Sequence, residues 1–199
     1  MIQAIVFDLF GTLVYLGRDS HPYLRLCRAV GVGRRVRESL SSNAEDLKAF
    51  SYELQADPPA DIGRLSADLE ADIRSAKLFP DVIQTLEKLR QQRLPLAIIS
   101  NLAAPYRSVV STLGISEYLT AAIYSCDVGY CKPDPAIYKV AQQALGKPAA
   151  NTLMVGDSYR CDVQGPAAYG MKSILLNRKK KVSNDASISS LDEVLAWTD

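Results

Sequence analysis

Short apolar runs alternate with amphipathic segments along much of the chain. Residues 2–7 form an apolar run rich in β-branched side chains, which predicts a buried strand that ends at Asp8. After residue 78, strands and helices are predicted to alternate, and several helices end at a glycine such as Gly146. This alternation predicts a parallel sheet with right-handed crossovers. The predicted strands are 94–99, 121–124, 152–155 and 173–176, and the predicted helices are 82–89, 106–113, 135–145, 163–169 and a short one within 190–197.

Residues 15–77 have a different pattern. Three apolar stripes at helical spacing, within 23–30, 47–54 and 65–73, predict a helical insertion of two to four helices. The expected fold is therefore a Rossmann-like α/β core of about five parallel strands, formed by residues 1–14 and 78–199, with a helical segment inserted after the first strand.

Composition narrows the class of protein. The chain has 199 residues, 48% of them hydrophobic and 23% charged, as in soluble globular proteins. A net charge of +1 predicts neither a nucleic-acid partner nor an anionic membrane surface. The first residues do not resemble a signal peptide, no apolar run is long enough to span a membrane, and the four cysteines form no CxxC pair or zinc spacing. We therefore expect a cytoplasmic protein with reduced thiols; no oligomeric state is predicted.

Polar side chains follow each predicted strand at its carboxyl end. Ligands of open parallel sheets bind beyond this edge, so these side chains are expected to share one site. The set comprises Asp8, Thr12, Ser100, Asn101, Lys132, Asp157 and Asp162.

Three carboxylates in this set would repel one another. A hard divalent cation relieves such repulsion, and Mg²⁺ prefers a few carboxylates together with water and phosphate oxygens. Asp8, Asp157 and Asp162 therefore predict a Mg²⁺ site, and Lys132 adds a positive point charge.

The same residues suit a phosphoryl substrate. The hydroxyl groups of Thr12 and Ser100 can donate hydrogen bonds to phosphate oxygens, and Asp8 can attack phosphorus to form an aspartyl-phosphate. Such a reaction requires mainly positioning and neutralisation of charge.

The order of these residues resembles that of the haloacid dehalogenase-like hydrolases. The motifs that carry the resemblance are Asp8-Leu-Phe-Gly-Thr12, Ile-Ile-Ser100-Asn101, Gly-Tyr-Cys-Lys132-Pro-Asp-Pro and Val-Gly-Asp157-Ser158-Tyr-Arg-Cys-Asp162. Each motif alone is weak, but the ordered set at this spacing is specific. The resemblance implies that residues 15–77 form a helical cap of type 1.

The resemblance also implies roles for individual residues. Asp8 would be the nucleophile and a Mg²⁺ ligand, together with Asp157, Asp162 and the backbone carbonyl of Phe10. Lys132 would neutralise the nucleophile and the phosphate.

Phosphate binding in the family uses hydroxyl groups and backbone amides. Thr12 and Ser100 would provide the hydroxyl groups here, and the backbone near Gly11 and Asn101 would provide amides. The substrate would be a small phosphorylated molecule.

One position departs from the phosphatases of the family. They carry a second aspartate, a general acid and base, where this chain has Phe10; such assistance is worth ~10²–10⁴-fold in rate. The family's dehalogenases have an aromatic residue there, but they need no metal and replace the acid that corresponds to Asp157. We therefore expect a Mg²⁺-dependent phosphatase-like hydrolase of a small phosphomonoester, with reduced activity. The alternatives are a metal-independent 2-haloacid dehalogenase, a phosphonate-cleaving enzyme that uses Lys48, and an impaired member that binds a phosphorylated ligand.

Two cap residues are further candidates for substrate binding. Arg18 lies close to the hinge and could meet an anionic substrate, and His21, the only histidine, could replace the missing acid or base. The alternative is structural, with Arg18 on a solvated face and His21 at the start of a helix before Pro22. The basic run Arg178-Lys179-Lys180-Lys181 is predicted to be a solvated loop.

Overall fold

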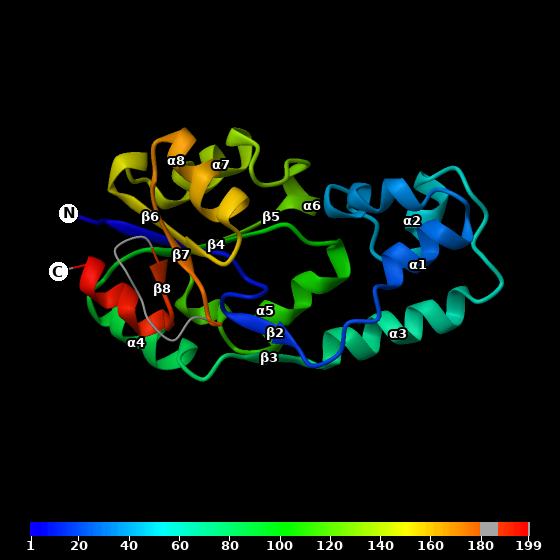
Figure 1. Ribbon diagram of the computed structural model, residues 1–199, viewed down its shortest axis with the longest axis horizontal. Coiled ribbons are helices and arrows are strands. Elements are labelled where there is room, and N and C mark those ends of the chain that lie inside the picture. The colour runs from blue at the N-terminus through cyan, green and yellow to red at the C-terminus, as the bar shows by residue number, and fades with distance from the viewer. Residues whose placement is uncertain (180–186, 199) are drawn as a thin grey trace.

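The computed structural model describes residues 1–179 and 187–198, and its larger part is built on a six-stranded sheet (Figure 1). All neighbouring strands are parallel, in the order β5-β4-β1-β6-β7-β8. The strands are β1 (Ala4–Phe7), β4 (Leu96–Ser100), β5 (Ala121–Tyr124), β6 (Thr152–Gly156), β7 (Lys172–Leu176) and β8 (Ser187–Ile188). About five strands were predicted; the additional β8 has only two residues, too few to produce a periodic pattern.

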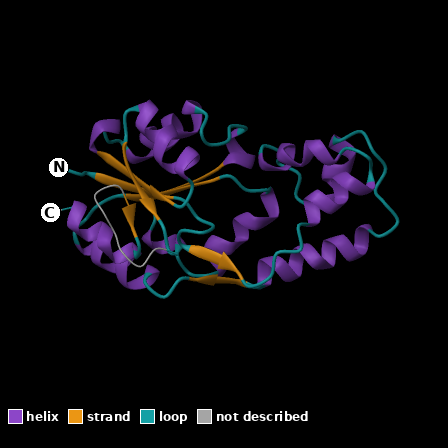
Figure 2. Cartoon of the chain, in the orientation of Figure 1, coloured by secondary structure: helices purple, strands orange, loops and turns teal. Residues whose placement is uncertain are grey.

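Helices cover both faces of this sheet (Figure 2). The main helices are α4 (Val82–Gln91), α5 (Ser108–Thr112), α7 (Pro135–Leu145), α8 (Gly165–Tyr169) and the 3₁₀ helix η6 (Leu191–Trp197). Alternate residues of β1 point to opposite faces: Ile5 and Phe7 pack with α4, α5 and η6, whereas Ala4 and Val6 pack with α7. Shorter elements are η2 (Ala104–Arg107), η3 (Ser116–Tyr118), α6 (Ser125–Val128), η4 (Ala149–Asn151) and the π-helical η5 (Tyr159–Gln164).

The inserted residues fold around a hydrophobic cluster of their own, at the right in Figure 1. Leu26, Leu47, Phe50 and Leu65 are the large side chains at its centre, each at most 1% exposed. The inserted helices are α1 (Pro22–Ala29), η1 (Gly33–Leu40), α2 (Leu47–Glu53) and α3 (Ile62–Arg74). We refer to this part as the cap.

A short antiparallel pair joins the cap to the sheet domain. It consists of β2 (Val14–Leu16) and β3 (Ala76–Leu78), in which Tyr15 pairs with Lys77. The two crossings of the chain therefore lie side by side and form a two-stranded hinge.

Arg107 provides a second connection between the cap and the sheet domain. Its guanidinium contacts the carboxylates of Glu45, in the cap, and of Asp127, in α6. Ala103 and Tyr106 also pack against the cap cluster. The cap thus lies over the carboxyl ends of the strands, where the polar side chains are found.

The prediction of a solvated basic loop is wrong for Arg178. Its side chain is 17% exposed and forms an ion pair with Asp81, with Nη1 2.8 Å and Nη2 3.0 Å from the carboxylate oxygens. The guanidinium also lies 3.9 Å from the centre of the Phe79 ring. Lys180 and Lys181 lie outside the described residues, and no described helix is long and apolar enough to cross a membrane.

Candidate active site

Asp8 lies at the carboxyl end of the central strand β1 and is 7% exposed. Its backbone N–H still belongs to the sheet, because it donates to the carbonyl of Val155 at 2.9 Å. The carboxylate accepts hydrogen bonds from Lys132 Nζ at 2.7 Å and from Thr12 Oγ1 at 3.2 Å. The predicted nucleophile is therefore fixed by its strand and by two neighbouring donors.

Lys132 lies between two carboxylates. Its ammonium, only 2% exposed, is 2.7 Å from both Asp8 Oδ1 and Asp162 Oδ1. The Asn101 side chain holds the lysine's backbone, since its Nδ2 donates to the Lys132 carbonyl at 2.9 Å and its Oδ1 accepts from the Lys132 amide at 2.7 Å. Burial opposes the charge, but the two carboxylates outweigh it and raise the pKa of Lys132. The lysine therefore remains an ammonium.

Asp162 belongs to η5, which follows β6. Its Oδ2 accepts a hydrogen bond from the Ser158 amide at 2.9 Å, and the side chain is 1% exposed. A β-carbon at Gly156 would lie 2.3 Å from Asp162 Cγ, so glycine is required for the carboxylate to approach the strand end. Tyr138 supports the same element, because its O–H donates to the Cys161 carbonyl at 2.5 Å.

Asp157 completes a group of three carboxylates. A β-carbon at Gly11 would lie 2.2 Å from Asp157 Oδ2, which shows how closely the loop after β1 approaches this side chain. Gly11 also has φ +89°, a conformation that favours glycine. One oxygen from each of Asp8, Asp157 and Asp162 lies within 4.8 Å of the others.

The electrostatics of this group favour a cation. Burial raises the pKa of Asp8 to about 6, against the opposing effect of Lys132, and the charge of Asp162 adds to the rise. Burial and Asp162 likewise raise the pKa of Asp157. Three clustered carboxylates with one lysine in direct contact form a set of hard oxygen donors with unbalanced negative charge, which fits a divalent ion such as Mg²⁺.

A cavity of about 250 Å³ lies between the cap and the strand ends. Phe10 and Asn101 line it from the sheet domain, and His21 lines it from the cap. The Phe10 ring meets Tyr106 edge to face, with 5.8 Å between ring centroids. Ser100, at the end of β4, is 2% exposed.

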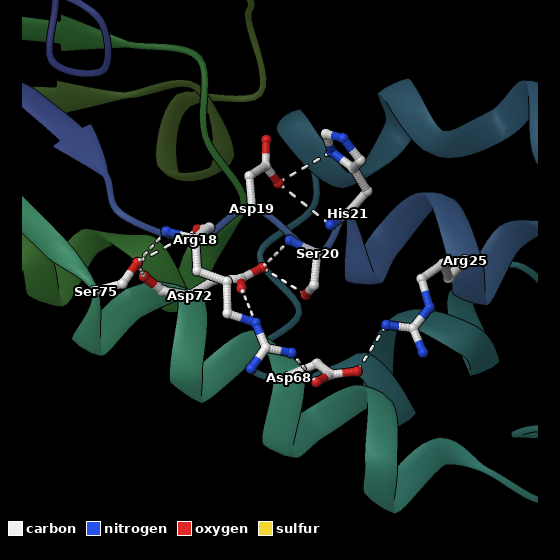
Figure 3. Close-up of polar contacts among 8 residues, drawn as sticks. All are labelled: Arg18, Asp19, Ser20, His21, Arg25, Asp68, Asp72 and Ser75. Atoms are coloured by element: carbon white, nitrogen blue, oxygen red, sulfur yellow. Dashed lines mark hydrogen bonds and ion pairs between the residues drawn. The ribbon is translucent and has the colours of Figure 1, made fainter.

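The two candidate substrate-binding residues of the cap differ in their contacts (Figure 3). Arg18 points toward α3, where it contacts Asp68 and lies 3.3 Å from Asp72 Oδ1. His21 Nδ1 lies 3.0 Å from Asp19 Oδ1, and both residues line the cavity. Lys48 is exposed on α2.

Two contacts at the site were not predicted from the sequence. Arg178 Nη2 donates to the Thr12 carbonyl at 2.6 Å. The two residues are 166 positions apart in the sequence, so no local pattern predicts this contact. The side chain of Asn101 holds the backbone of Lys132, a role that the predicted phosphate binding through the backbone amide near Asn101 does not include. The position of Asn101 directly after Ser100 identifies it as a site residue but not this role.

Comparison with known proteins confirms the resemblance noted in the motifs. Residues 2–170 match the haloacid dehalogenase-like hydrolase family. The chain is 32% identical to a phosphoglycolate phosphatase of Yersinia pestis, covering 98% of this chain and 89% of that protein. It is 29% identical to (S)-2-haloacid dehalogenase 2 of Pseudomonas sp. (strain CBS-3), covering 97% and 94%.

Solved structures agree with the predicted α/β fold. The crystal structure of a HAD phosphatase from Thermococcus onnurineus superposes with a TM-score of 0.70 at 25% identity, covering 99% of this chain and 98% of that chain. From its motifs, its fold and these relatives, the chain belongs to the haloacid dehalogenase-like hydrolases.

Proposed function

We propose that this hydrolase is a Mg²⁺-dependent phosphatase that acts on a small phosphomonoester. The observation that carries the proposal is Asp157, whose carboxylate lies within 4.8 Å of those of Asp8 and Asp162. Asp157 is the exposed member of the group, but its charge still raises the pKa of Asp8 and so opposes ionisation of the nucleophile; a bound cation would remove this repulsion. Both phosphatases and dehalogenases occur among the relatives, so the donor set is the basis of the choice.

The cation would be held by Asp8, Asp157 and Asp162, with the Phe10 carbonyl as a further candidate ligand. When bound, it would offset the negative charge of the phosphoryl group and of the carboxylates. Lys132 would offset further negative charge, since its ammonium already contacts Asp8 Oδ1.

Asp8 would attack phosphorus with a carboxylate oxygen. The bond between phosphorus and the ester oxygen breaks, and the leaving oxygen takes a proton from solvent. Water then attacks phosphorus, the bond to Asp8 breaks, and inorganic phosphate and a free carboxylate are restored. Thr12 and Ser100 would donate hydrogen bonds to phosphate oxygens, with backbone amides near Gly11 and Asn101.

Phe10 sets a limit on this reaction. Its ring lines the cavity where a proton donor would be expected, and it packs against Tyr106. A hydrocarbon ring transfers no proton, so we expect slow turnover of esters with poor leaving groups. His21 lines the same cavity and is the candidate for a substitute donor.

Phe10 is also the observation that favours the second candidate, a metal-independent 2-haloacid dehalogenase. In that reaction Asp8 would attack carbon and displace halide. The aromatic ring fits this chemistry, whereas Asp157 and the unbalanced carboxylates do not.

Two assays separate the candidates. The phosphatase predicts release of p-nitrophenol from p-nitrophenyl phosphate that requires Mg²⁺, stops with EDTA and is abolished in Asp8→Asn. Asp157→Asn should raise the Mg²⁺ concentration needed for half-maximal rate, whereas Asp134→Asn, at the start of α7, is the matched control that should leave it unchanged. Halide release from a 2-haloacid in the presence of EDTA, without phosphatase activity, would overturn the proposal.

A further inference from the structure

The cavity wall between the cap and the strand ends is mostly apolar. The residues that form this apolar wall are Phe10, Leu16, Pro22, Leu24, Val36, Leu40, Leu102 and Ala103. They come from both the cap and the sheet domain, so a molecule held there would contact hydrocarbon on both sides. Phe10 belongs to this wall and follows the proposed nucleophile, Asp8, by two positions in the sequence.

Several polar groups of the wall are engaged by other protein atoms, whereas the Tyr23 hydroxyl, a neutral group that also belongs to the lining, is buried without a hydrogen-bond partner among the described residues. Ser39 Oγ donates to the Val36 carbonyl at 2.7 Å, and the Asn101 side chain holds the backbone of Lys132. The Asp19 carboxylate accepts from the His21 amide at 3.2 Å and lies 3.0 Å from His21 Nδ1. His21 has φ +52°, and its contacts with Asp19 bring a carboxylate to the cavity.

Arg18 and Arg25 point toward Asp68 on α3 (Figure 3), and neither lines the cavity. Arg18 contacts Asp68 and Asp72, and Arg25 Nη1 lies 2.7 Å from Asp68 Oδ2. Asp72 is fully buried and also accepts from the Ser20 amide at 2.8 Å and hydroxyl at 2.6 Å. The segment that carries Arg18 is therefore fixed on α3, and Arg18 is not placed to receive a ligand.

The cavity is thus suited to a neutral group. Among the described residues, neither a lysine nor an arginine lines it, and Asp19 would repel an anion. A carboxylate bound there would lose its hydration without gaining an ion pair with a lysine or an arginine, which is unfavourable in an apolar site. A hydrocarbon or aromatic group would gain the free energy of burial.

From this wall we infer that the organic part of the substrate is uncharged and largely apolar, so that the phosphate is its only strongly charged group. The inference rests on the proposed phosphatase function and specifies its substrate class: phosphomonoesters of neutral, apolar alcohols or phenols, and not phosphorylated carboxylic acids.

A matched pair of esters tests the inference. Phenyl phosphate and 4-carboxyphenyl phosphate have similar size and leaving-group basicity and differ by one carboxylate. We expect kcat/KM to be at least about 10-fold higher for phenyl phosphate, a modest factor for one unpaired charge in an apolar site. Equal or higher kcat/KM for the carboxylated ester would overturn the inference.

Acetyl phosphate separates failure of the inference from failure of the proposed function. Its acyl group is small, and its hydrolysis reports the chemistry at Asp8 almost independently of the cavity. No Mg²⁺-dependent turnover of acetyl phosphate or of either aryl ester would overturn the phosphatase proposal. Turnover of acetyl phosphate together with a preference for the carboxylated ester would overturn only the substrate class.

A substitution in the wall provides a second test. Leu24→Lys adds an ammonium to the cavity, and we expect it to move the ratio of the two kcat/KM values toward the carboxylated ester by roughly 10-fold. Leu24→Gln adds polarity without charge and is the matched control, so the effect is the difference between the two variants. An equal shift in both variants would contradict the charge argument.

Discussion

Removal of the Arg178 guanidinium tests whether the end of β7 stabilises the hinge and the loop after β1. In the structure this group donates to both oxygens of Asp81 and to the Thr12 carbonyl, at 2.6–3.0 Å. Asp81 precedes α4 and also accepts from the Leu191 amide at 2.8 Å. One arginine therefore connects three segments that are distant in sequence.

The size of the expected loss of stability follows from the burial of the ion pair between Arg178 and Asp81. Hydrogen bonds to charged groups contribute about 1.5–3 kcal/mol when buried, and exposed ion pairs contribute below about 1 kcal/mol. Arg178 and Asp81 side chains are each 17% exposed, and Asp81 keeps its Leu191 partner after the substitution. We therefore expect Arg178→Met to lower the free energy of unfolding by about 2–3 kcal/mol, or roughly 5–10 °C in Tm for a chain of this length.

The pH dependence of the free energy of unfolding provides a second test of the same prediction. Burial alone would raise the pKa of Asp81, but the hydrogen bonds from Arg178 and the Leu191 amide outweigh burial and lower it. A carboxyl with a lowered pKa adds stability above its unfolded value, about 3.9, and this stability is lost as the pH falls through the folded value. The difference between wild type and Arg178→Met should thus be constant above about pH 5 and shrink below about pH 4.

Equilibrium unfolding in urea measures both effects. Arg64→Met, at an exposed position of α3, is the matched control and should change the free energy of unfolding by less than about 0.5 kcal/mol. Arg178→Lys should recover less than half of the loss, because an ammonium cannot reproduce the two-pronged contact. Equal stability of Arg178→Met and wild type at neutral pH would refute the reasoning.

Three further substitutions probe the site and the cap. Gly156→Ala places a β-carbon 2.3 Å from Asp162 Cγ, and we expect kcat/KM for p-nitrophenyl phosphate to fall by at least about 100-fold; a near-normal rate would show that the carboxylate can shift without cost. Tyr138→Phe removes a buried hydrogen bond and should cost about 1–2 kcal/mol of stability in urea unfolding, an effect that an unchanged midpoint would exclude. Asp72→Asn weakens two contacts with Ser20 and should cost about 1–3 kcal/mol, which a Tm equal to that of wild type would contradict.

The predictable part of the fold is the part with long, regular patterns. The strand 121–124 and the helix 135–145 were predicted with the bounds that the structure shows, because a short apolar run marks the strand, and a first-turn proline and a terminal glycine mark the helix. The strands β2, β3 and β8 have only two or three residues, so they were missed. They form because partners distant in sequence supply their hydrogen bonds.

The contacts of the site also divide into those that the sequence predicts and those that it does not. The carboxyl ends of the strands allow the sequence to predict that Asp8, Lys132 and Asp162 meet, since parallel topology alone brings such residues to one edge. Arg178 could not be placed in this way. Its partner Asp81 is 97 positions away, and a run of basic residues is more often solvated than paired.

Phe10 connects the chemistry of the site with the proposed substrate class. The ring that removes the usual proton donor also extends the apolar wall and packs against Tyr106. Phenols leave as phenolates without a proton donor, whereas simple alcohols do not, so both consequences of Phe10 favour an aryl ester. The rate for wild type should therefore fall steeply as the leaving group becomes more basic. Phe10→Asp should flatten this dependence and raise kcat for alkyl phosphates by roughly 10–100-fold, with a smaller gain for p-nitrophenyl phosphate. An equal change for both classes of ester would mean that proton transfer to the leaving group does not limit the reaction.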